Sequence, residues 1–170
     1  MANGANRDDT IEVFVEIPKG SRNKYEYDPE RKMIRLDRRL FSATVYPADY
    51  GFIPETLGED GDPLDALVLN ADPTFPGCLV TARPLAVFWM EDEKGGDAKI
   101  ICAPEPDPDL ANASDLDDIP SHMRAEIKHF FTVDKDLEPG KSSSTRDYEG
   151  RDAAWTEIRA ARDRLRTTQA

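Results

Sequence analysis

This chain contains few cysteines and histidines and has no net positive charge. Its 170 residues include two cysteines, Cys78 and Cys102, and two histidines. A zinc centre built from these residue types is therefore not expected, and two lone cysteines in strand-like sequence are more typical of buried thiols than of a disulfide. Lys and Arg total 22 against 34 Asp and Glu, which gives a formal net charge of −12. Because nucleic acids and anionic membranes attract basic surfaces, neither is expected as a partner.

Long apolar runs are also missing. The longest run, from Leu85 to Met90, has six residues, whereas a membrane-spanning helix needs about 20. The first ten residues are polar and lack the apolar segment of a secretion signal. These features predict a soluble, cytoplasmic protein in which residues 1–10 form a flexible tail and residues 11–170 form a single domain.

Apolar periodicity predicts strands first and helices last. Ile11–Ile17 alternates apolar and polar side chains, as a half-buried strand does, and Lys24–Asp28 and Met33–Asp37 flank a turn typical of a hairpin. Further strands are expected at 66–69, 78–90 and 97–103, and the second of these is one strand or two strands broken at Pro84. Helical spacing is found from residue 119 to 131 and from 155 to 165. This order favours an α+β fold, in which two helices pack on a small closed barrel.

Three carboxylates are crowded into the run Asp60-Gly-Asp62-Pro-Leu-Asp65. Such crowding destabilises a fold unless a cation neutralises it. The run is not an EF-hand loop, because Leu64 stands at a ligand position and Asp65 stands where that loop needs glycine. A solvated acidic turn remains the alternative, since Asp-Gly and Asp-Pro both favour turns.

A second acidic pair, Asp92 and Asp97, brackets residues 93–96. A hairpin that closes there would place the two carboxylates opposite each other at about 5 Å, where like charges cost about 3 kcal/mol. A divalent cation between them would reverse that cost; two solvated acids at the ends of a loop are the alternative. Lys99 lies on the same strand face as Asp97 and is placed to contact an anion. Carboxylates without His or Cys favour Mg²⁺ or Mn²⁺ over Zn²⁺.

Seven segments, in order, resemble the family I soluble inorganic pyrophosphatases over nearly the whole chain. They are Val15–Pro18, Lys24–Glu26, Leu36–Arg38, Tyr46–Gly51, Glu59–Asp65, Asp92–Lys99, and His129–Phe131 followed by Lys135–Glu138. The run D-G-D-P-x-D is the family signature, and residues 23–27 and 137–141 are similar to the bacterial, actinobacterial branch. The resemblance implies a five-stranded OB-like closed β-barrel with two packed helices, and a homohexamer. It also implies Mg²⁺-dependent hydrolysis of inorganic pyrophosphate to two phosphates by a metal-activated water, with Mn²⁺ as a substitute ion.

The same resemblance implies a role for each matched site residue. The implied metal ligands are Glu16, Asp60, Asp65, Asp92 and Asp97, and the candidates for accepting a proton from the attacking water are Asp62 and Asp97. The implied phosphate contacts are Lys24, Arg38, Tyr50, Lys99 and Lys135, with Glu26 and Tyr46 as supporting residues. One position departs from the family pattern: Asp134 stands where a tyrosine precedes the matched lysine. An ionised aspartate donates no hydrogen bond to phosphate, so weaker binding of pyrophosphate is expected.

Two other functions remain open from the sequence. One is an acidic divalent-metal-binding protein with weak or no hydrolase activity, and the loss of the tyrosine at Asp134 favours it. The other is a phosphohydrolase that acts on nucleotides or polyphosphate. That activity would need a pocket for a base or an extended basic groove, and the sequence identifies neither.

Overall fold

Eight strands and two α-helices are present in residues 9–170, the part of the chain that the computed structural model describes. The strands are β1 (Ile11–Ile17), β2 (Asn23–Asp28), β3 (Met33–Arg39), β4 (Asp49–Phe52), β5 (Asp65–Val68), β6 (Leu79–Asp92), β7 (Gly95–Pro104) and β8 (Ser143–Gly150). The helices are α1 (Ser121–Val133) and α2 (Arg151–Gln169), with a 3₁₀ helix, η2 (Leu116–Asp118), before α1. Of the tail expected over residues 1–10, only the last two residues lie within the described part.

The predicted α+β fold is confirmed, with two strands, β4 and β8, that periodicity did not indicate. The first strand, the hairpin and both helices lie where they were expected. β8 was missed, and it lies between the two helices, so the strands do not all precede the helices. Its residues, SSTRDYEG, contain no apolar alternation. β8 forms because its backbone pairs with the edge of β6, a contact between segments far apart in the sequence.

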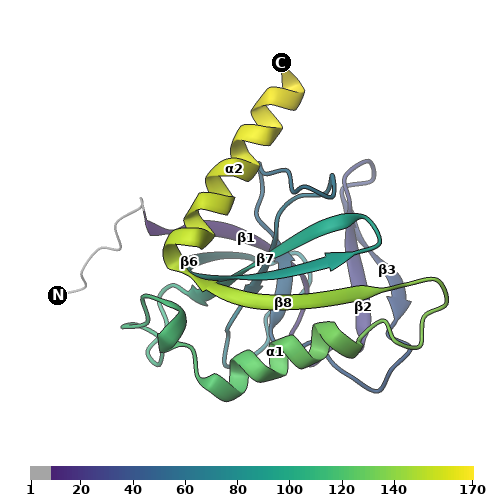
Figure 1. The fold of residues 1–170 in the computed structure, drawn as a ribbon, viewed down its shortest axis with the longest axis horizontal. Coiled ribbons are helices and arrows are strands. Elements are labelled where there is room, and N and C mark those ends of the chain that lie inside the picture. The colour runs from purple at the N-terminus through teal and green to yellow at the C-terminus, as the bar shows by residue number, and fades with distance from the viewer. Residues whose placement is uncertain (1–8) are drawn as a thin grey trace.

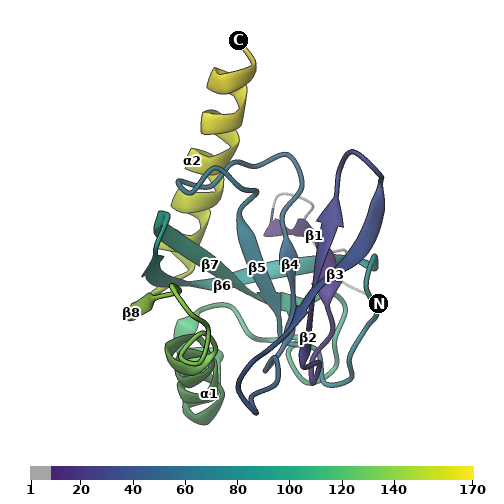
Figure 2. The ribbon, with the colours of Figure 1, turned by 90° about the vertical axis from the view of Figure 1, so that its right-hand side faces the viewer.

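Five strands close into a ring. Their order is β1-β4-β5-β7-β6, and β6 pairs back onto β1. The β5–β7 pairing is parallel and the other four pairings are antiparallel. β8 extends the sheet beyond β6, and β2 and β3 form a separate hairpin. This is the expected five-stranded OB-like barrel (Figure 1), with the helices to one side of it and the β2–β3 hairpin to the other (Figure 2).

Strand β6 is long enough to change partners along one edge. Residues 79–82 pair with β1, and residues 86–92 pair with β8. Pro84 lies between these two stretches, next to a register shift in the pairing with β7. A proline has no N–H to donate, so it is tolerated at such an irregularity. Of the two possibilities that the sequence left open, the structure shows one continuous strand.

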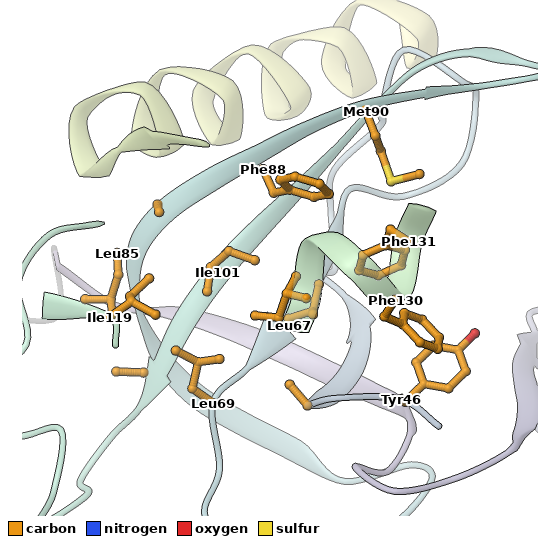
Figure 3. Close-up of a cluster of buried hydrophobic side chains, with 14 of the residues drawn as sticks. Tyr46, Leu67, Leu69, Leu85, Phe88, Met90, Ile101, Ile119, Phe130 and Phe131 are labelled. Carbon is orange, nitrogen blue, oxygen red and sulfur yellow. The ribbon is translucent and has the colours of Figure 1, made fainter. Parts of the chain in front are cut away.

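Alternate residues along the barrel strands enter two apolar clusters. On β7, Ile101 belongs to the cluster that includes Phe130 and Phe131 of α1, whereas Ile100 belongs to the cluster that includes Ile158 of α2. Because side chains alternate along a strand, each helix covers a different set of strand residues. Figure 3 shows the first cluster, with Leu85 and Ile119 at one end and Tyr46, Phe130 and Phe131 at the other.

The β2–β3 hairpin packs against the face of β1 that carries Phe14, opposite the face that carries Val13 and Val15. Phe14 lies 5.1 Å from Phe52 and 5.0 Å from Tyr27, measured between ring centroids. β1 and β4 approach each other so closely there that a Cβ on Gly51 would lie 1.9 Å from the carbonyl oxygen of Phe14. This packing also holds the hairpin beside Glu16, which lies two residues after Phe14 on the same face of β1.

Cys78 and Cys102 are both free thiols; Cys102 is buried as expected, whereas Cys78 is partly exposed. Within residues 9–170, none of the helices combines the length and the apolar character that crossing a membrane requires.

Candidate active site

A cavity of about 690 Å³ opens where the β2–β3 hairpin, the barrel and the end of α1 meet. Every residue that the sequence singled out for the site lines this cavity. They are Glu16, Lys24, Glu26, Arg38, Tyr46, Tyr50, Asp60, Asp62, Asp65, Asp92, Asp97, Lys99 and Lys135. They come from segments between residues 16 and 135, so only the folded chain brings them together.

Acidic residues outnumber basic residues in the wall of the cavity. Ten Asp or Glu and six Lys or Arg line it, so four negative charges are in excess when every group is ionised. A site with this balance repels an anion and attracts cations. An anionic substrate would therefore enter together with cations.

Lys99 of β7 is the centre of the polar network. Its Nζ lies 3.0 Å from Oδ2 of Asp65, 3.0 Å from Oδ2 of Asp97 and 3.0 Å from the hydroxyl oxygen of Tyr50. The Tyr50 hydroxyl donates to Asp65 at 2.7 Å. Burial acts to lower the pKa of Lys99, but the charges of Asp65 and Asp97 outweigh it and hold that pKa above its usual range. The buried ammonium is therefore charged and balanced by two carboxylates.

The aromatic end of the core forms the floor beneath this network. The ring of Phe131 lies 4.9 Å from Nζ of Lys99, and the ring of Tyr50 lies 5.2 Å from the same atom. Tyr46 packs between Tyr50 and Phe130, with ring centroids 5.5 and 4.7 Å away. The ring of Tyr46 therefore packs against the wall from which Tyr50 reaches Asp65.

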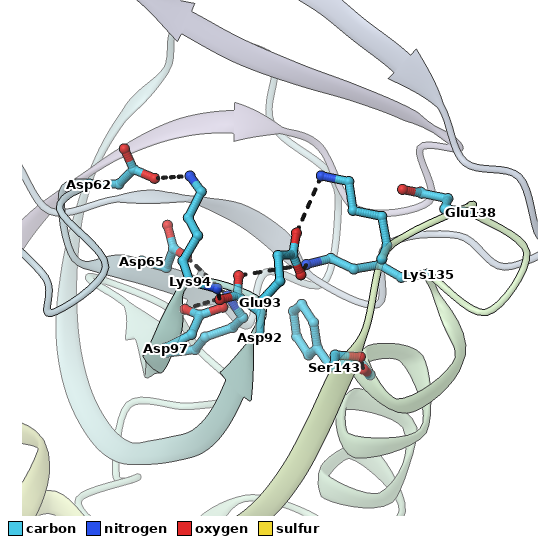
Figure 4. Close-up of polar contacts among 12 residues, drawn as sticks. Asp62, Asp65, Asp92, Glu93, Lys94, Asp97, Lys135, Glu138 and Ser143 are labelled. Carbon is cyan, nitrogen blue, oxygen red and sulfur yellow. Dashed lines mark hydrogen bonds and ion pairs between the residues drawn. The ribbon is translucent and has the colours of Figure 1, made fainter.

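The predicted face-to-face pairing of Asp92 and Asp97 is wrong. The hairpin turns through residues 93–94, so that Asp92 pairs with Gly95 and Asp97 pairs with Met90. Gly95 has a φ of +120°, which an L side chain rarely adopts, and this permits the tighter turn. The two carboxylates are diagonal neighbours on one face, for which a separation of about 7–8 Å is usual. Figure 4 shows Asp65, Asp92 and Asp97 grouped together.

Asp97 and Glu16 are carboxylates in strongly desolvated positions. Burial raises the pKa of Asp97; the Lys99 charge opposes this, and the Asp65 and Asp92 charges add to it. Burial also raises the pKa of Glu16 to about 7, although the backbone N–H of Tyr27 donates to it at 2.7 Å. No Lys or Arg among the described residues forms an ion pair with Glu16. Its negative charge thus lacks a counterion at the cavity wall.

Arg38 of β3 is held by a residue that sequence reasoning did not single out. Nε of Arg38 lies 2.9 Å from Oε1 of Glu138, and Nη2 lies 2.9 Å from Oε2, while Nη1 donates to Asp37. Glu138 is buried. This two-point contact fixes the plane of the guanidinium and leaves one N–H on each terminal nitrogen. The signal available was the matched segment Lys135–Glu138, but nothing in it indicates a partner 100 residues away.

Other lysines and acids pair around the rim. Lys94, which the sequence reasoning also missed, lies 3.1 Å from the exposed Asp62, and Lys24 donates to Glu26. Lys135 lies 3.7 Å from Asp92. In Figure 4, Lys94 extends toward Asp62, and Lys135 extends toward Asp92 and Glu93. The rim lysines are thus spread over both sides of the carboxylate group, where an anion would meet them.

The donor set fits a hard divalent cation. Within residues 9–170, no three His, Cys, Asp or Glu side chains are arranged to hold a metal ion as they stand, and Asp65 and Asp97 are each paired with Lys99. The cavity nevertheless presents carboxylate oxygens without thiol or imidazole, an excess of four acids, and Glu16 without a counterion. Oxygen-only donors of this kind suit Mg²⁺ or Mn²⁺.

Comparison with known proteins finds relatives over nearly the whole chain. A family model described as inorganic pyrophosphatase matches residues 13–166. An inorganic pyrophosphatase from Streptomyces coelicolor is 55% identical over 156 residues, which are 92% of this chain and 96% of the relative. One from Methanosarcina acetivorans is 55% identical over 152 residues, 89% of this chain and 90% of the relative. The crystal structure of inorganic pyrophosphatase from Thermus thermophilus has a TM-score of 0.92 at 45% identity, covering 98% of this chain and 97% of that one. The family match spans every residue that lines the cavity.

Proposed function

We propose two properties of this chain, which belongs to the inorganic pyrophosphatase family and is an enzyme that hydrolyses pyrophosphate to phosphate. Its working ion is Mg²⁺, and its active site is the cavity around Lys99. Enzymes of this family use divalent metal ions, and the choice of Mg²⁺ rests on the oxygen-only donor set. The observation that carries the proposal is the convergence of thirteen separately matched residues on one cavity.

The metal-holding residues are Glu16, Asp60, Asp65, Asp92 and Asp97. They lie on β1, on β5 and the loop before it, and on the β6–β7 hairpin, so the ions would lie between the barrel and the β2–β3 hairpin. When bound, Mg²⁺ neutralises substrate charge and lowers the pKa of the attacking water. Lys99 holds Asp65 and Asp97 in place before the ions arrive, and this preorganises two ligands against their mutual repulsion.

The phosphate groups are bound by Lys24, Arg38, Tyr50, Lys99 and Lys135. The guanidinium of Arg38 has two N–H groups left after its contacts with Glu138 and Asp37, and two N–H groups in one plane suit two oxygens of one phosphate. Lys24 and Lys135 supply mobile positive charge at the rim. These cations stabilise the negative charge that develops on the departing phosphate.

The proton of the attacking water passes to Asp97 or Asp62. Asp97 is 8% exposed and lies against Lys99, whereas Asp62 is exposed and pairs with Lys94. Removing the base lowers kcat by about 10²–10⁴-fold. Asp62→Asn is the variant that separates the two candidates, because Asp97 is also a proposed metal ligand and its loss lowers kcat in either case. A loss of about 10²–10⁴-fold in Asp62→Asn would identify Asp62 as the acceptor, and near-normal turnover would identify Asp97.

Phosphate release is the direct test of the function. Pyrophosphate, ATP and tripolyphosphate are compared at equal concentration, with Mg²⁺ and with excess chelator. Release from pyrophosphate alone, and only with Mg²⁺, is the expected result. Metal binding without release would favour the acidic metal-binding protein, and faster release from ATP or tripolyphosphate would favour the wider phosphohydrolase.

We also propose that the chain assembles as a homohexamer and acts in the cytoplasm. Large apolar side chains that are at least half exposed, Met33, Leu36, Phe41, Phe75, Leu79 and Leu137, supply surface that association would cover. Two free thiols suit a reducing compartment. Light scattering should give a mass of six times 19.1 kDa, and a monomer would refute the assembly. Cell fractionation with activity as readout tests the location.

A further inference from the structure

Asp134 is a buried carboxylate at the edge of the active-site cavity, and no side chain within residues 9–170 pairs with it. It directly follows α1, and its backbone N–H donates to the carbonyl of Phe130 at 2.8 Å. It is 6% exposed and lines the cavity with Arg38 and Lys135. Oδ1 is buried and has no hydrogen-bond partner in the part of the chain that the structure describes. Among the described residues, no ion pair reaches this carboxylate either.

The surroundings of Asp134 favour its neutral form. Burial has the largest effect, and a helix C-terminus disfavours a negative charge. The charged groups that face Asp134 are Lys135, Lys99 and Arg38, which favour ionisation, and Glu138, which opposes it; the phenol of Tyr46 also lies nearby. The balance raises the pKa of Asp134 to about 6. Those three cations also disfavour a further metal ion at this carboxylate.

An incoming phosphate shifts the balance further toward protonation. Its negative oxygens would enter the cavity beside Arg38 and Lys135, the same side chains that favour an ionised Asp134. Phosphate and carboxylate would then share these cations in a partly desolvated corner, where like charges repel strongly. A carboxylic acid has no such repulsion, and its O–H can donate where a carboxylate cannot.

We propose, building on the proposed function, that Asp134 binds pyrophosphate as a neutral carboxylic acid whose O–H donates to a phosphate oxygen, so that substrate binding takes up one proton. The proton comes from solvent, forms an O–H bond on the Asp134 carboxylate and returns to solvent after product release. No other bond is made or broken at this residue. Asp134 is thus a substrate-binding residue that links the affinity for pyrophosphate to pH.

The first test compares KM for pyrophosphate across pH 5.5–9 in the wild type, Asp134→Asn and Asp134→Ala. The amide of Asp134→Asn has the same shape and donates at every pH. The ratio of wild-type KM to Asp134→Asn KM should be flat below about pH 6 and then rise about tenfold per pH unit, until the pKa of the bound form is reached. The ratio to Asp134→Ala should be below one at low pH, where alanine lacks the donor, and should exceed one at high pH. Protonation of substrate and metal ligands is common to all variants and cancels in these ratios.

Asp136→Asn is the matched control, because Asp136 is exposed and two residues away. It removes the same charge outside the cavity, so its KM ratio to wild type should not change with pH. A flat ratio for Asp134→Asn, or an equal slope for Asp136→Asn, would overturn the proposal. If the wild type releases no phosphate from pyrophosphate at any pH, the proposed function itself fails.

The second test does not depend on turnover. Calorimetry with methylenediphosphonate and Mg²⁺, in buffers of different ionisation enthalpy, counts the protons taken up on binding. Near pH 7 the wild type should take up more protons than Asp134→Asn, with the difference approaching one. Equal uptake by the two proteins would refute the inference.

Discussion

Replacing Lys99 by methionine would remove the cation that lies between the buried Asp97 and the half-buried Asp65. Nζ of Lys99 lies 3.0 Å from both Asp65 and Asp97, and its side chain is 3% exposed. Each contact is worth about 5 kcal/mol at an effective dielectric near 20, but burying the ammonium costs several kcal/mol in return. Leaving buried carboxylates unpaired typically costs about 3–5 kcal/mol. The free energy of unfolding of Lys99→Met, measured in chelator, should therefore fall by about that amount.

Lys94→Met is the control, because it makes the same substitution in an exposed pair. Nζ of Lys94 lies 3.1 Å from Asp62, with side chains 57% and 62% exposed. Exposed pairs contribute about 0–1 kcal/mol, so this variant should stay within 1 kcal/mol of the wild type. The distances are nearly equal, so the two variants differ in the burial of the pair and in the second carboxylate that Lys99 contacts.

Urea unfolding followed by tryptophan fluorescence, at one fixed protein concentration, measures both variants. Mg²⁺ should raise the urea midpoint of Lys99→Met more than that of the wild type, because the ion takes over the role of the lost ammonium. A Lys99→Met protein as stable in chelator as Lys94→Met would show that Lys99 does not balance the two carboxylates.

Four further predictions follow from the site and the fold. Asp65→Asn and Asp97→Asn should each lower kcat by at least about 10²-fold. The fold should persist, because Lys99 keeps one carboxylate partner in each variant. Circular dichroism checks the fold and phosphate release measures kcat, and near-normal turnover would contradict the assigned roles. Activity should vanish in excess chelator and fall when Ca²⁺ is added to the Mg²⁺ enzyme, because Ca²⁺ accepts looser geometry; full activity in chelator would exclude metal-dependent hydrolysis. Gly51→Ala should lower the unfolding free energy by at least about 1–3 kcal/mol, since its Cβ would meet the Phe14 carbonyl oxygen at 1.9 Å, and an unchanged urea midpoint would refute that contact. In chelator, the free energy of unfolding should fall as pH rises from about 4.5 to about 7, because folding holds Glu16 protonated with a pKa of about 7. Glu16→Gln should remove about 2–3 kcal/mol of this pH dependence. The same pH dependence in Glu16→Gln and the wild type would contradict the assignment to Glu16.

Local patterns in the sequence determine the elements that pack by alternation or helical spacing. Ile11–Ile17 became β1 with the bounds its alternation indicated, and Ile11, Val13 and Val15 are at most 3% exposed. Such patterns suffice because burying every second side chain, or every third and fourth, is a property of the segment itself. The crowding of carboxylates in the Asp60–Asp65 run could be identified in the same way, but the run by itself left a solvated turn as an alternative to a cation site.

Only the tertiary structure decided what depends on register and on distant partners. The two-residue turn at 93–94 changed the partner of Asp97, because a shift in a hairpin turn re-pairs every residue beyond it. Polar β8 exists because the edge of β6 accepts its backbone. Glu138 reached Arg38 across 100 residues, and Lys99 came to lie between Asp65 and Asp97 through the parallel pairing of β5 with β7. The residue types of this site can be identified in the chain, but which charges pair with one another is decided only when closure of the barrel sets the distances between them.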